Sequence, residues 1–248
     1  MKSENKILLI GGRGTLGSSI IKSKLFKNID APSKKKLNLL KRTDIKKVLK
    51  NKYSLIINCA AMARMKECEL NPSKAINVNV FGALNLVREI INYEKRLNKK
   101  IKLLHISSDG VYPSLKGNYS ENSKLRPYNI YGLTKMYAEK SVMLLNKYVI
   151  IRTNFFDKKK IKFKNAATDI YTSMLEVQSL VKKIKLISLS NFSGIVNVGS
   201  QRKSNYRNFK KYKRNIKPCK RDDIIKKLNF NIPKDSSMNL GLFKKVIK

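Results

Sequence analysis

The 248-residue sequence predicts a doubly wound α/β fold, in which helices cover both faces of a parallel sheet. Three observations lead to this prediction. Short, almost continuously apolar runs alternate with longer stretches of helical periodicity, as expected of strands buried on both faces. A glycine-rich loop follows the first of these runs. Two serines close a later run, at the edge where open α/β sheets bind ligands.

The elements can be assigned in order along the first part of the chain. Four apolar runs predict strands: Lys6–Ile10, Leu55–Cys59, Leu103–Ser107 and Val149–Arg152. A helix is expected from Thr15 to about Lys27, and another from Asn71-Pro72, because Asn is a favoured N-cap and Pro a favoured first helical residue. Apolar residues at helical spacing then predict one buried stripe, formed by Ile76, Val80, Leu84, Val87 and Ile91.

The pattern changes after Arg152. We expect a basic loop at Lys158–Lys164, a helix over Asp169–Lys185 and a strand over Gly194–Val198. The sequence therefore divides into a nucleotide-binding domain at 1–149, which contains the glycine-rich loop, and a small, irregular segment at 150–248.

Composition excludes several classes of protein. The 55 basic and 16 acidic residues give a net charge of +39, but the lysines are dispersed and no aromatic–basic recognition motif accompanies them, so we expect no specific nucleic-acid partner. No apolar run reaches the roughly 18–20 residues of a membrane span, and none resembles a secretory signal peptide. Three cysteines and one histidine show no metal-ligand spacing, so no metal is expected. A cytoplasmic location is the resulting expectation.

The glycine loop Gly11–Gly17 has the spacing G-x-x-G-x-x-G between a predicted strand and a predicted helix. Glycines allow the backbone to approach a pyrophosphate, and the helix N-terminus offers free N–H groups. Arg13 is placed to pair with the 2′-phosphate of NADP, near Ser33–Lys35, whereas Asp30 would favour a ribose hydroxyl of NAD. The loop therefore predicts a dinucleotide, with NADP(H) favoured over NAD(H). The expected contacts are Gly11, Arg13, Gly14, Thr15, Leu16 and Gly17.

A second constellation predicts acid–base chemistry. Tyr131 and Lys135 are four residues apart and therefore share one helix face. A protonated lysine beside a phenol lowers the pKa of the phenol towards the range of a working acid–base catalyst. Ser108, or alternatively Ser107, ends a strand and can hydrogen-bond a carbonyl oxygen to which Tyr131 gives a proton. His105, in the same strand, is expected only to pack near the site.

Nine stretches carry a resemblance to a known family. They are Gly11–Gly17, Leu37–Leu39, Ile57–Ala61, Glu67–Pro72, Asn79–Ala83, Ile106–Tyr112, Pro127–Lys135, Arg152-Thr153 and Gly194–Gly199. Through them the chain resembles the extended short-chain dehydrogenases/reductases of Rossmann fold, and among these the dTDP-4-dehydrorhamnose reductases. Between Phe156 and Asp169 the chain is short for that family, so the resemblance implies an abbreviated substrate-binding segment.

The resemblance implies NADP-dependent reduction of the 4-keto group of a nucleotide-linked 6-deoxy sugar. Ser108 is then the catalytic hydroxyl, Tyr131 the acid, and Lys135 its modulator and a ribose ligand. The cofactor wall implied by the family is Ala60, Ala61 and Met62, together with Tyr131 and Lys135, and the implied substrate contacts are Ser108, Asp109 and Asn154. Two alternatives remain open: an NAD-dependent nucleotide-sugar epimerase or dehydratase, and a non-catalytic regulatory subunit. A homodimer is also open.

Overall fold

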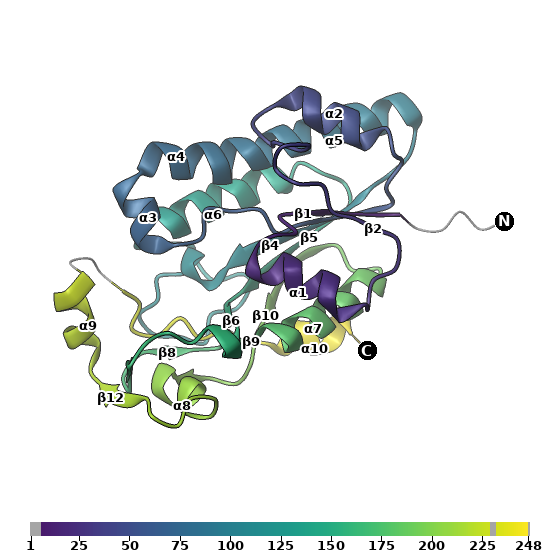
Figure 1. The fold of residues 1–248 in the computed structure, drawn as a ribbon. Coiled ribbons are helices and arrows are strands. Elements are labelled where there is room, and N and C mark those ends of the chain that lie inside the picture. Colours follow the sequence, from purple (N-terminus) through teal and green to yellow (C-terminus); the bar gives the residue numbers. More distant parts are fainter. Residues whose placement is uncertain (1–5, 229–231, 248) are drawn as a thin grey trace.

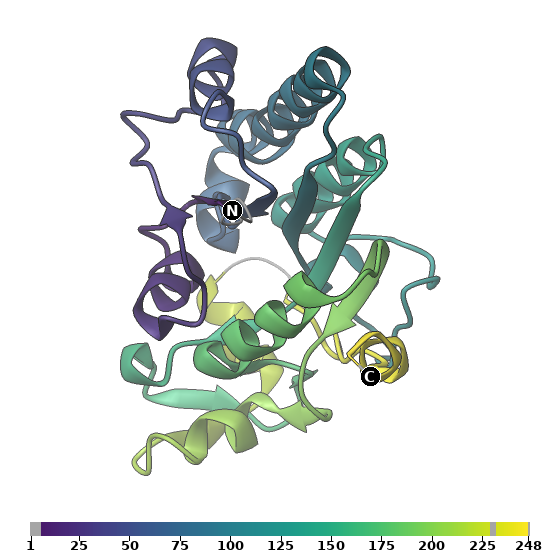
Figure 2. The ribbon, with the colours of Figure 1, turned by 90° about the vertical axis from the view of Figure 1, so that its right-hand side faces the viewer.

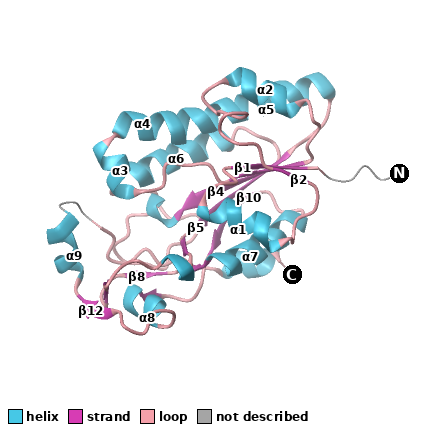
Figure 3. Cartoon of the chain, in the orientation of Figure 1, coloured by secondary structure: helices cyan, strands magenta, loops and turns pink. Residues whose placement is uncertain are grey.

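A computed structural model describes residues 6–228 and 232–247 of the chain. Its centre is a sheet of six parallel strands in the order β10-β5-β4-β3-β1-β2 (Figure 3). The strands are β1 (Ile7–Ile10), β2 (Ile29–Asp30), β3 (Leu55–Asn58), β4 (Lys102–Ser108), β5 (Tyr148–Thr153) and β10 (Gly194–Val198). The predicted doubly wound parallel sheet is confirmed, and the five predicted strands are confirmed to within a residue at each end. The two-residue strand β2 has no apolar run that would have indicated it.

Helices cover both faces of this sheet (Figure 1). One layer contains α2 (Arg42–Leu49), α5 (Gly82–Leu97) and α6 (Ile130–Val142), and the other contains α1 (Thr15–Ser23), α7 (Val177–Leu189) and α10 (Gly241–Val246). Successive strand residues point to opposite faces, so Leu8 joins the core beneath α5 whereas Leu9 joins the core beneath α1 and α7. None of the helices among the described residues is both long and apolar enough to span a membrane.

The later part of the chain builds a small lobe beside the sheet. Three pairs of short strands form there: β6 (Phe155–Phe156) with β9 (Leu175–Glu176), β7 (Asn165–Ala167) with β12 (Lys217–Cys219), and β8 (Tyr171–Thr172) with β11 (Lys203–Ser204). Helices α8 (Asn205–Lys210) and α9 (Arg221–Leu228) complete it. Figure 2 shows these green and yellow elements gathered below, apart from the blue helices of the first hundred residues. The expected boundary at residue 149 falls within β5, and α7, β10 and α10 return to the sheet after it.

The predicted helix over Asp169–Lys185 is wrong in its first turns. Tyr171–Thr172 and Leu175–Glu176 are instead strands that pair with β11 and β6. The helix begins at Val177 because the side chain of Glu176 caps it, accepting a hydrogen bond from the backbone N–H of Gln178 at 2.8 Å. The helix expected after Thr15 is also shorter, since Lys24 takes the left-handed conformation at φ 56° and ends it.

The predicted apolar stripe after Pro72 is also partly wrong. Ile76 and Leu84 are exposed, while Ala75, Ala83 and Ile90 face the core. Helix α4 (Pro72–Ile76) passes through a π-helical turn at Asn77–Phe81 before α5 begins. The i→i+5 bonds of that turn change the angular spacing of the side chains, so a uniform 3.6-residue period does not identify the buried face.

Candidate active site

The strand order reverses at β1: β2 lies on one side of it, and β3 and all later strands of the sheet lie on the other. Open α/β sheets bind ligands in the crevice at the carboxyl ends of the strands at such a reversal. The glycine loop follows β1 at this point and lies against the chain leaving β3. Gly11 has φ +83°, and a Cβ there would lie 2.8 Å from the backbone nitrogen of Ala60. A Cβ on Gly17 would lie 2.3 Å from the Gly11 carbonyl oxygen. These two glycines are therefore required by close backbone packing.

Two adjoining cavities open on this loop. One, of about 280 Å³, is bordered by Gly11, Arg13 and Ala60, and by Ser33 and Lys34 after β2. The other, of about 380 Å³, contains the remaining candidate residues: Thr15, Leu16, Gly17, Ser108, Asp109, Tyr131, Lys135 and Asn154. Gly14, Cys59 and Ala61 line both cavities. The structure thus brings the predicted cofactor loop and the predicted Ser–Tyr–Lys residues to two cavities that share part of their walls.

The loop is suited to an anion. The N-cap of α1 is Gly14, which has no side chain to cap the helix, and no acidic residue lies in the first turn of that helix. The N–H groups at the start of α1 and the positive end of its dipole therefore face the cavity. This cradle of glycines and free N–H groups fits a dinucleotide pyrophosphate.

Two residues that the sequence placed near the cofactor lie outside both cavities. Met62 lines neither cavity; its backbone is instead bonded to the side chain of Asn79, which accepts from the Met62 N–H at 2.7 Å and donates to the Met62 carbonyl at 3.1 Å. Asp30 is also absent from both cavity walls, and the Tyr53 hydroxyl donates a hydrogen bond to its carboxylate. The acid that would have favoured NAD is thus engaged away from the candidate cofactor site.

The start of α6 positions Tyr131 next to the end of β4. The Asn129 side chain caps this helix by accepting from the Gly132 N–H at 2.7 Å. A Cβ on Gly132 would lie only 2.1 Å from the carbonyl oxygen of Gly110, so glycine is needed for the helix to approach the turn after β4. In that turn the Ser108 hydroxyl accepts a bond from the Gly110 N–H at 3.0 Å.

Lys135, one turn along α6, is 2% exposed. Its Nζ lies 2.7 Å from the Ile106 carbonyl oxygen and 3.2 Å from Nε2 of His105. Burial lowers the pKa of Lys135 to about 8, although the charge of Glu139 opposes the shift. Burial also raises the pKa of Tyr131 to about 12, while a hydrogen bond with Ser108 opposes that shift.

The sequence expectation of a lowered phenol pKa is therefore wrong for the protein without a ligand. Two physical reasons account for it: the phenol loses solvation, and the Lys135 amine is directed to His105 and Ile106. At neutral pH Tyr131 is therefore protonated.

Asp109 connects this site to the C-terminal part of the chain. Its Oδ2 accepts from the Asn154 amide at 2.9 Å and from the Ser236 hydroxyl at 2.7 Å, and its Oδ1 accepts from Ser108 at 3.2 Å. Burial raises the pKa of Asp109, and these hydrogen bonds partly oppose the shift. Asp109 thereby fixes the segment around Ser236 as one wall of the cavity.

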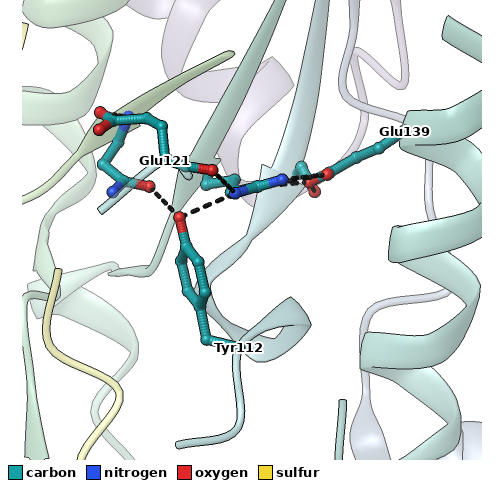
Figure 4. A network of polar contacts seen from close by, with 6 residues as sticks. Tyr112, Glu121 and Glu139 are labelled. Carbon is teal, nitrogen blue, oxygen red and sulfur yellow. Dashed lines mark hydrogen bonds and ion pairs between the residues drawn. The ribbon is translucent and has the colours of Figure 1, made fainter. Parts of the chain in front are cut away.

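Ser107, the alternative hydroxyl, belongs to a different network (Figure 4). It donates to Glu139, whose carboxylate also receives three hydrogen bonds from the Arg152 guanidinium, the shortest at 2.8 Å. Arg152 further donates to the Tyr112 hydroxyl at 2.9 Å and to the Glu121 carbonyl at 3.0 Å. The side chains of Arg152 and Glu139 are each 2% exposed. The network connects β4, β5 and α6, and the Ser107 hydroxyl is engaged in it.

Sequence reasoning missed several residues that shape the site. Asn79, in the π-helical turn, connects the loop after β3 to Thr134 of α6 through a 2.9 Å hydrogen bond. Tyr128 contributes a second phenol to the cavity wall, and Ser236 comes from more than a hundred residues downstream. Asn79 begins the Asn79–Ala83 stretch that carries part of the family resemblance, but only its buried polar contacts reveal its role.

A larger cavity of about 1080 Å³ adjoins the one lined by Tyr131 and extends into the lobe. The two share Met65, Asn154, Pro233 and Ser236. Apolar side chains form much of the larger wall, among them Phe163, Met174, Phe209, Ile224 and Ile232, and lysines border it at positions 164, 226 and 227. The lobe therefore retains room for a sizeable ligand group next to Tyr131.

Comparison with known proteins decides the family. The model of the RmlD substrate binding domain matches residues 5–187 of the chain. The chain belongs to this family. Among the relatives is a dTDP-4-keto-6-deoxy-D-glucose reductase of Streptomyces niveus, 29% identical over 154 residues, which are 59% of this chain and 51% of that protein. Another is methionine adenosyltransferase 2 subunit beta of Danio rerio, 28% identical over 150 residues, which are 56% of this chain and 43% of that protein. The matches thus span about half the length of these curated relatives.

Solved structures of dTDP-4-dehydrorhamnose reductases have the same fold as this chain. A dTDP-4-dehydrorhamnose reductase of Bacillus anthracis, in complex with NADP, superposes with a TM-score of 0.83 at 22% identity, covering 97% of this chain and 91% of that one. A hypothetical dTDP-4-dehydrorhamnose reductase of Sulfolobus tokodaii gives 0.79 at 25% identity, covering 97% and 94%. The similarity of fold therefore includes the small lobe as well as the sheet.

Proposed function

We propose that the protein is an NADP(H)-dependent reductase of the 4-keto group of a nucleotide-linked 6-deoxy sugar. The observation that carries this proposal is that Ser108, Tyr131 and Lys135 line one cavity with the N-terminus of α1 and its glycine loop. Family membership and the reductases among its relatives point to the same reaction class.

The proposed cofactor would lie across the two cavities at the glycine loop. Gly11, Gly14 and Gly17 would hold the pyrophosphate against the start of α1, and Ala60 and Ala61 would form the opposite wall. Arg13, Ser33 and Lys34 border the cavity of about 280 Å³. There they would bind the 2′-phosphate that distinguishes NADP from NAD. The engagement of Asp30 by Tyr53 supports the same preference.

When bound, the reduced nicotinamide supplies the hydride. The Ser108 hydroxyl donates a hydrogen bond to the substrate's 4-oxygen, which requires it to turn from Asp109. Tyr131 gives its phenolic proton to that oxygen as negative charge develops there, and its raised pKa keeps the proton in place until then. The Lys135 ammonium or amine orients the ribose beside Tyr131.

The sugar would contact the part of the wall formed by Asp109 and Asn154. Thr153, 3% exposed, supports a polar ligand there: the residue lines this cavity, and its buried Oγ1 has no hydrogen-bond partner within the described part of the chain. The nucleotide would extend into the lobe cavity, where lysines 164, 226 and 227 can meet its diphosphate.

The test is NADPH oxidation in the presence of dTDP- and GDP-linked 4-keto-6-deoxy sugars, combined with thermal shifts for NADPH and NADH. A ligand at 100 times its Kd adds about 2.7 kcal/mol of stability and should raise Tm measurably. We expect NADPH to stabilise more than NADH and one of the sugars to be reduced. NADPH binding without turnover of any sugar would reject the reductase assignment.

A second candidate function, a non-catalytic subunit of another enzyme, is favoured by the similarity to methionine adenosyltransferase 2 subunit beta. Replacing Tyr131 by Phe separates the two functions. A subunit role would survive the substitution in a cellular complementation assay, whereas the reductase role would not.

A further inference from the structure

The cavity of about 380 Å³ and the lobe cavity of about 1080 Å³ share part of their walls. The shared residues are Met65, Asn154, Pro233 and Ser236. The amide of Asn154 and the hydroxyl of Ser236 already donate hydrogen bonds to Asp109, at 2.9 and 2.7 Å. Met65 and Pro233 have no side-chain donor. A ligand that extends from one cavity into the other therefore depends on neighbouring residues for further hydrogen-bond donors.

Tyr128 is such a neighbour, and its hydroxyl has no strong acceptor. It precedes α6 in the chain and lines the cavity of about 380 Å³. The hydroxyl oxygen lies 3.9 Å from the sulfur of Met65, and among the described residues it donates to no oxygen or nitrogen atom. A thioether sulfur is a weak acceptor, and this one also receives a bond from the Asn129 amide at 3.2 Å. The Tyr128 O–H is therefore available to a stronger acceptor.

The surroundings of this phenol keep it a donor. Burial raises the pKa of Tyr128, and the negative charge of Asp109 adds to the shift, whereas the positive charge of Arg221 in α9 opposes it. The guanidinium of Arg221 is held in place by two hydrogen bonds to the Ile232 carbonyl, at 2.7 and 3.1 Å. A protonated hydroxyl with a fixed cation acting on it suits an acceptor oxygen that carries negative charge.

The proposed substrate offers such an oxygen. C1 and C4 are at opposite ends of a pyranose ring, so a sugar whose 4-oxygen faces Tyr131 directs the phosphate on C1 away from that residue and towards the lobe cavity. We propose, resting on the proposed function, that the Tyr128 hydroxyl donates to a free oxygen of this phosphate. Tyr128 is then a substrate-binding residue that selects sugars with a phosphate at C1, and it takes no part in the proton transfer from Tyr131.

Nucleotides without a sugar test the contact in the absence of turnover. The phosphate on the sugar corresponds to the β-phosphate of dTDP or GDP, which dTMP and GMP lack. Tyr128→Phe keeps the ring and removes the O–H. In calorimetric titrations of the protein saturated with NADPH, we expect this variant to bind the diphosphate about 10- to 100-fold more weakly than the wild type, as for the loss of a hydrogen bond to a charged group. The Kd of the matching monophosphate should not change.

The control is Tyr137→Phe, which should bind all four nucleotides as the wild type does. Tyr137 also lies on α6, is 52% exposed and lines neither cavity. Equal Kd values for the diphosphate in the wild type and in folded Tyr128→Phe would overturn the assignment of Tyr128 alone, and so would an equal loss for monophosphate and diphosphate. A wild-type protein that binds neither dTDP nor GDP would overturn the proposed function as well.

Steady-state kinetics separate substrate binding from proton transfer. With the keto sugar as substrate, Tyr128→Phe should raise KM about 10- to 100-fold and leave kcat within about threefold of wild type, because the contact is the same in the ground state and the transition state. A fall in kcat at unchanged KM would place Tyr128 in the chemical step and overturn the proposal.

Discussion

Replacing Gly132 by Ala offers a test of how closely α6 must approach β4. The added Cβ would lie 2.1 Å from the Gly110 carbonyl oxygen, 2.9 Å from the Gly110 carbonyl carbon and 3.0 Å from Cβ of Pro127. Ordinary contact begins at 3.4 Å, so the helix start and the turn after β4 must separate by about 1.3 Å. Both contacting atoms of Gly110 are backbone, and no side chain can rotate to make room.

That separation changes the distance between Tyr131, adjacent to Gly132, and Ser108, which bonds Gly110. A misplacement of about 1 Å at a reacting centre costs roughly 100-fold, equivalent to about 2.7 kcal/mol of transition-state stabilisation. We therefore expect kcat/KM for the keto sugar to fall about 100-fold in Gly132→Ala, with the loss mainly in kcat. Overpacking should also lower stability by about 1–3 kcal/mol.

The assay is steady-state NADPH oxidation, with circular dichroism and NADPH titration to show that the variant is folded and binds cofactor. Gly241→Ala is the matched control. Gly241 begins α10, and its added Cβ meets only the flexible side chain of Asn239, at 3.1 Å. The reasoning is refuted if folded Gly132→Ala keeps kcat/KM within about threefold of wild type.

Three further predictions concern charge and proton binding. Glu139→Gln leaves Arg152 charged and buried without its partner, which should lower the free energy of unfolding by about 3–5 kcal/mol, or Tm by roughly 6–20 °C. As the control, Glu67→Gln in the exposed pair with Arg64 should change the free energy of unfolding by less than about 1 kcal/mol in the same thermal melt. Arg13→Ala should weaken NADPH binding about 10- to 100-fold and leave NADH unchanged; an equal loss for both would refute a contact with the 2′-phosphate. Because the pKa of His105 is held well below 6.5 in the folded protein, only the unfolded chain binds that proton below pH 6.5, so stability should fall by about 1.4 kcal/mol per pH unit on acidification. Chemical denaturation of His105→Gln should lack that contribution, and identical slopes in both proteins would contradict it.

The buried strands were predictable because both of their faces are apolar. Strand β10 was predicted at its observed bounds, since Gly194–Val198 is β-branched and apolar apart from Asn197. The two-residue β2 carries too little sequence to show a pattern, although its pairing with β1 places it firmly. The start of α7 was misplaced because Tyr171–Thr172 and Leu175–Glu176 form strands with partners far along the chain, which no local periodicity records.

The candidate residues Tyr131 and Lys135 were similarly predictable from their spacing in the sequence, but their environments were not. The four-residue interval from Tyr131 to Lys135 gives a shared helix face, whereas the neighbours of Lys135 come from β4, thirty residues earlier. The lowered pKa expected for Tyr131 assumed a charged lysine directed at the phenol. Burial and the hydrogen bonds of that lysine depend on tertiary packing, and they reverse the direction.

The proposed proton transfer from Tyr131 is tested most directly by single-turnover oxidation of bound NADPH, comparing the wild type with Tyr131→Phe on a dTDP-4-keto-6-deoxy sugar. Loss of a general acid should slow this step about 10²- to 10⁴-fold while the Kd for NADPH stays unchanged. Equal single-turnover rates in the two proteins would contradict the account.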